Sequence, residues 1–330
     1  MKKFINSVDS FLSESLAGFA AIHHDIVALG DTGTFVRRAS KPNGKVALVS
    51  GGGSGHEPLH AGFVGKGMLD AACPGQVFTS PTPDQITAAA SAVAGEKGVL
   101  FIVKNYAGDR MNFEMAAELH DGPTATIVTD DDVAVENSTW TTGRRGVAGT
   151  VIVEKIVGAA AEEGGSLESL KALGDEVNAR TRSIGVALTS CTVPAAGKPT
   201  FALEEDEMEM GVGIHGEPGR RRVKLAPAKA IAAEMMAAVL EDLGKAGFSE
   251  GQVVLLVNGF GGTPSLELYL MAAMARVELE RRGFAVARGL VGSYVTSLEM
   301  AGLSLTVSAA DERLLALWDA PVRTAALNWG

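Results

Sequence analysis

The sequence predicts an α/β protein with two domains, each a largely parallel or mixed sheet flanked by helices. Short apolar runs end in glycine or polar residues, helical stretches separate them, and the alternation starts again near residue 183. The chain has 330 residues, 46% of them hydrophobic and 21% charged, which is enough to bury two cores. We expect an N-terminal domain at 1–182 and a C-terminal domain at 183–330, divided in the polar stretch around residues 178–182.

The first half of the chain begins with an amphipathic pattern and continues with buried strands. Apolar residues across 5–19 recur at helical spacing. The later runs are apolar throughout, as strands buried on both faces of a parallel sheet are. Strands are expected at residues 46–50, 99–103 and 125–128, with helices at 80–94 and 147–163.

The second half repeats this alternation. Strands are expected at 184–188 and 253–257, with a helix from 227 to 243 between them. A further helix should open near Pro264, since proline suits a first helical turn. Ligands in sheets of this kind bind where strand carboxyl ends meet loops, so the polar ends of the strands are where a site is sought.

The charge balance argues against nucleic acid as a partner. The net charge is −10, and a chain of this balance repels a phosphate backbone unless a basic patch overrides it. The tight basic runs are Arg144–Arg145 and Arg220–Arg222, neither of them interleaved with aromatic residues. We expect both to be solvated or partner-facing surfaces.

Membrane and secreted classes are also disfavoured. No apolar window approaches the roughly 18 residues that span a bilayer, and acidic residues interrupt the first helix too early for a signal peptide. Cys73 and Cys191 are far apart and in no CxxC spacing, which favours a reducing compartment. The expected location is the cytoplasm.

A glycine-rich loop, GGGSGHEP at residues 51–58, directly follows the first predicted buried strand. Glycines let the backbone approach a small ligand closely and present several N–H groups to it. The loop is neither a Walker phosphate loop nor a GxGxxG fingerprint, because the required later residues are missing. His56 at its end can serve as an acid, a base or a hydrogen-bond partner. A tight strand–helix turn is the simpler alternative.

The same place contains a match to the zinc-protease signature HExxH, from His56 to His60. That signature needs both histidines on one face of an established helix, but glycines precede it and Pro58 interrupts it. We expect no metal here and interpret His60 as a packed or hydrogen-bonded helix residue. A zinc hydrolase stays open as the alternative.

Two further strand ends carry charged residues. Lys104–Asp109, with the sequence KNYAGD, follows the second strand, and a lysine that closes an apolar run needs a partner or a ligand. Asp109 lies beyond a glycine and could act as a general base, although a surface loop with a loose ion pair explains the stretch equally well. Asp130–Asp132 after the third strand fits either a cap or turn, or hard oxygen ligation of Mg²⁺.

A second glycine-flanked histidine lies in GVGIHGEPG, residues 211–219. The glycines leave the His215 imidazole sterically open, as a nucleophile needs. A neutral imidazole can add to a ketone and give a hemiaminal, which is a form of covalent substrate capture.

These stretches together resemble the K subunit of dihydroxyacetone kinases, in order from the first residues to the last. The stretches that carry the resemblance are KVALVSGGGSGHEP, ACPGQVFTSPTPDQI, VKNYAGD with MNFEMA, DDDVAV, GRRGVAGTV, SCTVPAAGKP, MGVGIHGEPG and LWDAPVRTAALNWG. The resemblance implies two α/β domains in a homodimer, with the ligand held by the glycine loop, the lysine loop and a histidine of the second domain.

The resemblance also implies roles for particular residues. His215 matches the histidine that forms the hemiaminal with the ketone carbon, and His56 matches the catalytic acid/base histidine. Asp109 matches the aspartate that contacts the hydroxyl to be phosphorylated, and either Asp109 or His56 would accept its proton. The implied substrate contacts are Gly53, Ser54, Gly55, His56, Lys104, Asp109 and His215. Relatives that lack the histidines act as regulators, so their presence favours an active subunit.

The resemblance also implies partner subunits, and the missing phosphate loop fits this implication. The chain itself is expected to bind no cofactor, while ATP or ADP with Mg²⁺ is expected on a separate L-type subunit, or phosphate arrives through an M-type phosphotransferase subunit. The substrate that the resemblance implies is dihydroxyacetone or a related short hydroxyketone, phosphorylated on a terminal hydroxyl. The alternatives are a ketose-binding regulatory protein of the same fold, or a kinase subunit for erythrulose or another C4 ketose.

Overall fold

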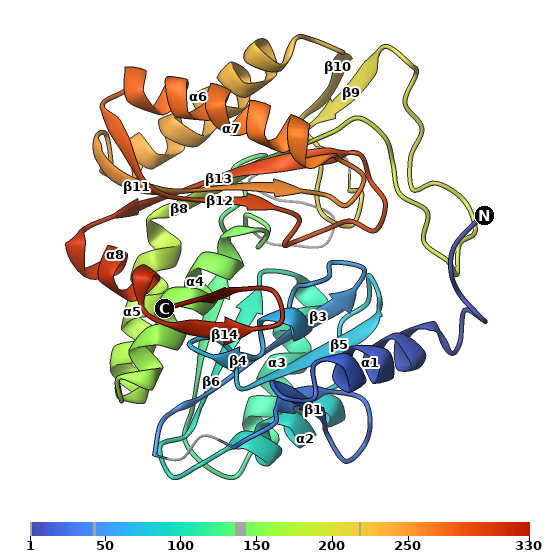
Figure 1. Cartoon of the computed structure of the whole chain (residues 1–330), viewed down its shortest axis with the longest axis vertical. Coiled ribbons are helices and arrows are strands. Elements are labelled where there is room, and N and C mark those ends of the chain that lie inside the picture. The colour runs from blue at the N-terminus through green and yellow to red at the C-terminus, as the bar shows by residue number, and fades with distance from the viewer. Residues whose placement is uncertain (1, 42–43, 136–142, 218) are drawn as a thin grey trace. The chain divides into compact units, whose positions relative to one another are not determined.

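The computed structural model describes residues 2–41, 44–135, 143–217 and 219–330, and it confirms the predicted α/β class (Figure 1). The chain divides into two compact units. The first contains Met1–Thr129, Val153–Asp175 and Leu317–Gly330, and the second contains Asp130–Ile152 and Glu176–Ala316. The predicted domain boundary between residues 182 and 183 stays a prediction.

The first unit is built on a mixed sheet in the order β1-β2-β5-β3-β6-β7. Strands β5, β3, β6 and β7 pair in parallel, while β1 and β2 add antiparallel pairs at one edge. The strand bounds are β1 Val27–Leu29, β2 Val36–Arg38, β3 Ala47–Ser54, β5 Ala71–Val77, β6 Val99–Lys104 and β7 Thr124–Thr129. Parallel β3 and β6 end at the same edge, which brings the glycine and lysine stretches together.

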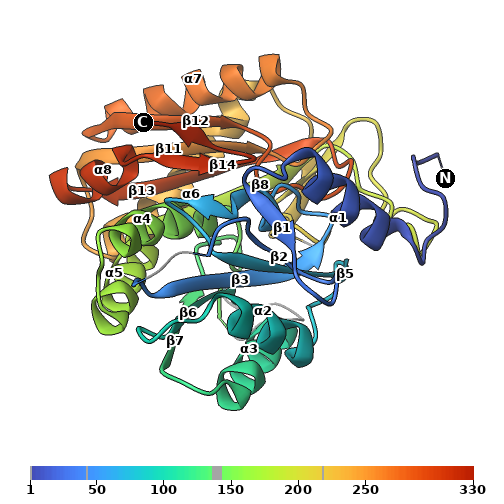
Figure 2. The ribbon, with the colours of Figure 1, turned by 60° about the horizontal axis from the view of Figure 1, so that its bottom comes forward.

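Helices α2 and α3 cover one face of this sheet (Figure 2). Helix α2, Pro83–Val93, starts with a proline in its first turn, and the side chain of Thr82 accepts a hydrogen bond from the Gln85 amide. Helix α3, Ala107–Leu119, follows the lysine stretch directly. Their alanine-rich inner faces pack on Phe101, Val103 and neighbouring strand residues in one apolar core.

Smaller elements complete the first unit. Helix α1 spans Phe11–Ile22, and a 3-10 turn, η1, spans Ala61–Phe63. A three-stranded sheet in the order β15-β14-β4 joins two segments that are far apart in sequence. Its strands are β4 Gly65–Lys66, β14 Val322–Thr324 and β15 Asn328–Trp329. Helices α4, Gly149–Glu162, and α5, Leu167–Ala179, each have residues in both units.

The second unit has a mixed sheet in the order β10-β9-β8-β13-β11-β12. Only β11 and β12 pair in parallel among these described strands. The bounds are β8 Thr181–Ala187, β9 Glu207–Met210, β10 Arg221–Lys224, β11 Gly251–Gly259, β12 Phe284–Gly292 and β13 Gly302–Ala310. The helices are α6 Ala228–Lys245, α7 Ser265–Arg281 and α8 Glu312–Asp319.

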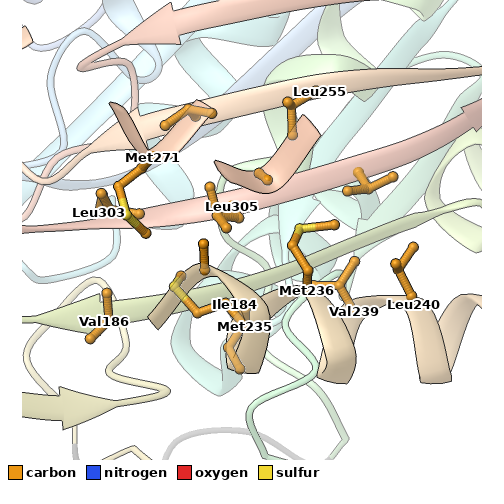
Figure 3. Close-up of a cluster of buried hydrophobic side chains, with 14 of the residues drawn as sticks. Ile184, Val186, Met235, Met236, Val239, Leu240, Leu255, Met271, Leu303 and Leu305 are labelled. Atoms are coloured by element: carbon orange, nitrogen blue, oxygen red, sulfur yellow. The ribbon is translucent and has the colours of Figure 1, made fainter. Parts of the chain in front are cut away.

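Helices α6 and α7 lie along one face of the second sheet (Figure 1). Met235, Met236 and Val239 of α6 point toward Ile184 and Leu305 of the strands, as Figure 3 shows. This cluster buries apolar side chains of both layers, and burial of each such side chain is worth about 1.5–3 kcal/mol. No helix of the described residues is both long enough and apolar enough to cross a bilayer.

Candidate functional site

The first part of the predicted glycine loop GGGSGHEP is the end of strand β3. Neighbouring atoms lie so close to its glycines that a side chain there would clash. A side-chain carbon on Gly51 would lie 2.5 Å from the Cys73 carbonyl oxygen, and one on Gly53 would lie 2.6 Å from the Thr79 amide nitrogen. A carbon on Gly52 would lie only 2.2 Å from Nζ of Lys104. The glycines therefore give the lysine of the next strand direct access to the loop backbone.

Lys104 ends strand β6 and is almost completely buried. Its Nζ lies 3.0 Å from Nε2 of His60, 3.4 Å from the Gly51 carbonyl oxygen and 3.6 Å from Oδ2 of Asp109. The partner that a buried ammonium needs is thus supplied by three groups rather than by one tight ion pair.

Asp109 lies in the first turn of α3, where the partial positive charge of the helix N-terminus favours a carboxylate. The residue is 3% exposed. Its Oδ1 has no hydrogen-bond partner among the described residues. A buried carboxylate oxygen of this kind is available to accept a proton from a ligand hydroxyl.

His60 differs from its prediction in secondary structure but not in contacts. It was expected on a helix, but it precedes the η1 turn, because Gly55 and Pro58 give this stretch a turn instead. Its Nδ1 lies 2.6 Å from Oε1 of Glu154 on α4 and 3.0 Å from the Ser50 hydroxyl. Both ring nitrogens are therefore engaged within the protein.

Burial sets the ionisation of this pair. It lowers the pKa of His60 well below the usual value, and the nearby Lys104 and His56 add to the effect. It also raises the pKa of Glu154 to about 8, although Lys104 opposes this. His60 is accordingly a neutral imidazole at neutral pH.

His56 is also buried, and its ring stacks on Phe78 with the centroids 5.0 Å apart and the planes at 15°. Ser54, the last residue of β3, donates its hydroxyl to the Gly75 carbonyl oxygen at 2.7 Å. The backbone at Gly52–Ser54 forms part of the wall of a pocket of about 420 Å³, to which α1 contributes Leu12, Leu16 and Phe19.

His215 lies in the second unit, in a turn flanked by glycines. Its Nδ1 lies 2.8 Å from Oε1 of Glu217, and its backbone amide donates to Oε2 of the same carboxylate at 3.1 Å. Gly213 makes room for this contact, since a side-chain carbon there would lie 1.9 Å from Oε2 of Glu217. The contact with Glu217 thus engages Nδ1 of the ring.

Glu217 is a buried carboxylate that stays ionised. Burial alone would raise its pKa, but the adjacent His215 and the guanidinium of Arg145 together lower it to about 2. Arg145 is held in turn by Asp132 at 2.6 Å and by the Gly211 carbonyl oxygen at 2.8 Å. The carboxylate can thus stabilise positive charge on the His215 ring.

Arg145 corrects the expectation that the Arg144–Arg145 run is a solvated or partner-facing surface. Arg145 is fully buried. Its guanidinium forms an ion pair with Asp132 and helps to lower the pKa of Glu217. Arg144 follows the expectation more closely, because it is partly exposed and pairs with Asp242. A charge run in the sequence does not show which of its members has buried acidic partners.

The aspartates at 130–132 act as caps and ion-pair partners. Asp131 accepts hydrogen bonds from the Val147 and Gly149 amides at 2.9 and 2.7 Å, at the start of α4. Asp132 pairs with Arg145, and Asp130 bonds Asn178. Over residues 2–41, 44–135, 143–217 and 219–330, no group of three or more His, Cys, Asp or Glu side chains is arranged to hold a metal ion.

Sequence reasoning missed Glu154 and Glu217 as members of these two clusters. Glu154 had a signal, because it interrupts the apolar run of residues 151–157 with a charge that must be buried or paired. Glu217 lies in the stretch GVGIHGEPG, which the sequence singled out only for His215 and its glycines. The structure brings Lys104, Asp109 and His60 together in the first unit, and His215 and Glu217 in the second.

Comparisons with known proteins agree on one family. Residues 17–326 match the model of the Dak1 domain. The "PEP-dependent dihydroxyacetone kinase, dihydroxyacetone-binding subunit DhaK" of Escherichia coli is 49% identical, with 100% of each chain covered.

Two solved structures are also similar over nearly the whole chain. The "Dihydroxyacetone kinase operon co-activator Dha-DhaQ" has a TM-score of 0.89 at 34% identity, with 95% of this chain and 97% of that chain covered. The dihydroxyacetone kinase of C. freundii in its native form has a TM-score of 0.87 at 33% identity, with 99% of this chain and 60% of that chain covered.

Proposed function

Because the chain belongs to the Dak1 family, we propose that it is the dihydroxyacetone-binding subunit of a dihydroxyacetone kinase, active with a partner subunit. The observation that carries this proposal is the His215–Glu217 pair, which joins an imidazole to a carboxylate that is ionised at neutral pH, in a glycine-lined turn. Such a pair suits reversible addition to a ketone.

The capture step balances without a co-reactant. The Nε2 lone pair of His215 adds to the ketone carbon, the C=O π bond breaks, and the carbonyl oxygen takes up a proton. Nδ1 loses its proton to the facing carboxylate of Glu217, which returns it to solvent, and solvent supplies the proton of the new hydroxyl, so the product is a neutral hemiaminal. Glu217 stabilises the positive charge that develops on the ring during this step. Only ketones or aldehydes can react, so glycerol is rejected by its chemistry rather than by its size.

The first unit supplies the groups for phosphoryl transfer. We assign Lys104 to the terminal hydroxyl as a hydrogen-bond donor, and either Asp109 or His56 as the acceptor of its proton. The buried Oδ1 of Asp109 supports this role, since it is not engaged by other described residues. Gly53, Ser54 and Gly55 are proposed as substrate contacts through their backbone, because the Ser54 hydroxyl is bonded to Gly75.

Phosphate must come from outside this chain under this proposal. The glycine loop has no lysine and serine or threonine at the spacing of a phosphate loop. ATP or ADP with Mg²⁺ on an L-type subunit, or a phosphotransferase M-type subunit, would deliver the phosphate. The E. coli relative is named as PEP-dependent, which favours the second route. The cytoplasm is the proposed compartment, since neither Cys73 nor Cys191 is in a disulfide.

A regulatory role is the second candidate, and one observation favours it: a protein of 34% identity and the same fold is titled an operon co-activator. A regulator that binds ketose would capture the ligand without passing phosphate to it. Phosphoryl transfer in the presence of a nucleotide-bearing subunit would therefore separate the two candidates.

A homodimer is proposed from one surface of the second unit. Leu266, Tyr269, Leu270 and Val277 of α7 form an exposed stripe opposite the helix's buried face, with Leu266 84% exposed. The neighbouring strand β12 lies at the edge of the described sheet, and Arg288 is its one charged residue. An apolar edge strand beside an apolar helix stripe suits a second copy, because β12 can pair with itself about a two-fold axis.

Calorimetric titration tests the proposed function. Dihydroxyacetone and glycerol are added separately to the wild-type protein and to His215→Ala. We expect the ketone alone to bind the wild type, and the substitution to weaken its binding by 100-fold or more, on the order of 3 kcal/mol. Equal binding of both ligands, or an unaffected variant, would overturn the proposed capture.

A further inference from the structure

A continuous row of buried polar side chains crosses the first unit from α4 to the start of α3. Glu154, His60, Lys104 and Asp109 come from four separate segments and are each at most 5% exposed. The row is joined at 2.6 Å between Glu154 and His60, 3.0 Å between His60 and Lys104, and 3.6 Å between Lys104 and Asp109. Its far end is the carboxylate proposed to face the substrate hydroxyl.

Donor and acceptor chemistry fixes the direction of this row. An ammonium has three donors and no acceptor, so Nε2 of His60 must accept from Lys104. A neutral imidazole then carries its one proton on Nδ1, which donates to Oε1 of Glu154. Ser50 does not compete as a donor, because its hydroxyl donates to the Ile102 carbonyl oxygen at 2.6 Å. Lys104 and Glu154 therefore favour the same tautomer of His60, with the proton on Nδ1.

The contact between Lys104 and Asp109 is longer than a hydrogen bond. A charge-assisted N–H···O bond is about 2.7–2.9 Å long, whereas these atoms are 3.6 Å apart. His60 and the Gly51 carbonyl oxygen hold the ammonium on the other side, over the bare α-carbon of Gly52. Without His60, the flexible lysine chain could close on Asp109 and form a full salt bridge.

We propose that His60 and Glu154 are positioning residues that hold the Lys104 ammonium back from Asp109, so that both groups stay available to the substrate hydroxyl. This role rests on the proposed function, because it matters only if Asp109 and Lys104 act on a substrate. The ionisable groups that act on the pair are Lys104 and His56, with Asp109 beyond the lysine. A merely structural pair would affect folding stability alone.

Nitrogen-15 NMR of the histidine rings and lysine ammonium groups tests the row without any assay of activity. We expect His60 of the wild type to carry its single proton on Nδ1 at pH 7, and the Lys104 ammonium protons to exchange slowly. His60→Leu should speed this exchange and shift the Lys104 signal. A His60 proton on Nε2, a charged ring at pH 7, or an unchanged Lys104 signal in His60→Leu would overturn the proposal.

Steady-state kinetics of the reconstituted kinase tests the functional consequence. The wild type, Glu154→Gln, His60→Leu and His60→Gln are assayed with dihydroxyacetone and a nucleotide-bearing subunit loaded with ATP and Mg²⁺. A misplaced lysine should lower kcat in His60→Leu by up to about 100-fold, with KM little changed. His60→Gln keeps an acceptor near Lys104 and should recover part of the loss, while Glu154→Gln should fall between.

Glu162→Gln is the matched control, because it makes the same change on the same helix at an ion pair with Arg38 and Lys45. It should keep the wild-type kcat, and thermal melts establish that every variant is folded. If His60→Leu lowers kcat no more than Glu162→Gln does, the proposal fails. If the wild type phosphorylates no ketone, the proposed function fails instead, and the NMR result alone decides whether the row positions Lys104.

Discussion

His215 and Lys104 each depend on a buried glutamate for their orientation. Glu154 lies outside the motifs of the sequence, and Glu217 lies within the His215 motif but has no evident role there. Glu217 engages Nδ1 of His215, and Glu154 acts on Lys104 through His60. The sequence pointed to candidate histidines, a lysine and an aspartate, because they follow predicted strands or lie beside glycines. These residues are His56, His215, Lys104 and Asp109. The sequence could not identify the acids, since the pairing of buried charges depends on tertiary contacts between distant residues.

Glu217 gives a prediction about pH and stability. Its pKa is lowered to about 2 in the folded protein from 4.5, so the carboxylate stabilises the fold above pH 4.5 and loses this contribution as the pH falls toward 2. The wild type should exceed Glu217→Gln in free energy of unfolding at pH 7, by at most about 3 kcal/mol. Urea titrations should show this gap closing between pH 4.5 and pH 2.

The control for this experiment is Glu241→Gln, which removes an exposed partner of Lys245 on α6 of the same unit. Its difference from the wild type should be small at every pH. A gap between the wild type and Glu217→Gln that stays constant with pH would show that the carboxylate is not selectively stabilised by His215 and Arg145.

At the scale of elements, the sequence predicted the apolar strands and the long helices well. Strands β3, β6, β7, β8 and β11 and helices α1, α2, α4, α6 and α7 overlap the predicted ranges. Strand β5 was not predicted, because Pro74 and Gly75 interrupt its apolar pattern. Strands β12 and β13 were also missed, and the order and mixed direction of the sheets depend on pairing between distant strands.

Gly52 gives the prediction at this scale. A methyl group at this position would lie 2.2 Å from Nζ of Lys104 and 3.5 Å from Nε2 of His60, so Gly52→Ala must displace the lysine from its site. We expect the variant to fold but to lose most of its phosphoryl-transfer activity, because Lys104 no longer lies between His60 and Asp109. Kinetics and a thermal melt of the same preparation measure both effects.

Gly18→Ala provides the comparison for Gly52→Ala. Gly18 lies in α1, and a side-chain carbon there has nothing within 4 Å. Alanine should stabilise the helix by about 0.5–1 kcal/mol and leave activity unchanged. Full activity in Gly52→Ala would mean that Lys104 does not act from the position described.

For the whole molecule, the central expectation is a dimer joined through α7 and β12. Helix α7 buries Leu268, Met271, Ala275 and Leu279 on one face and exposes apolar residues on the other. Large apolar side chains gathered on the exposed face of a helix mark an interaction surface. This exposed stripe could not be predicted from the sequence, because α7 has apolar residues on both faces and their spacing does not show which face is buried.

Light scattering tests the dimer. The wild type should have twice the mass of one chain, and Leu270→Glu should dissociate it by placing a charge in the apolar stripe. Met115→Glu is the matched control, since Met115 is an exposed apolar residue on α3 of the first unit. A dimer that survives Leu270→Glu, or a monomeric wild type, would rule out this interface.

The most direct measurement of covalent capture is carbon-13 NMR of dihydroxyacetone labelled at its ketone carbon. On binding to the wild type, the carbonyl signal should disappear and a signal of a tetrahedral carbon should appear, coupled to nitrogen-15 in the His215 ring. His215→Ala should show neither change. A bound ligand that keeps its carbonyl signal would contradict the account, because His215 would then hold the ketone without forming a bond to it.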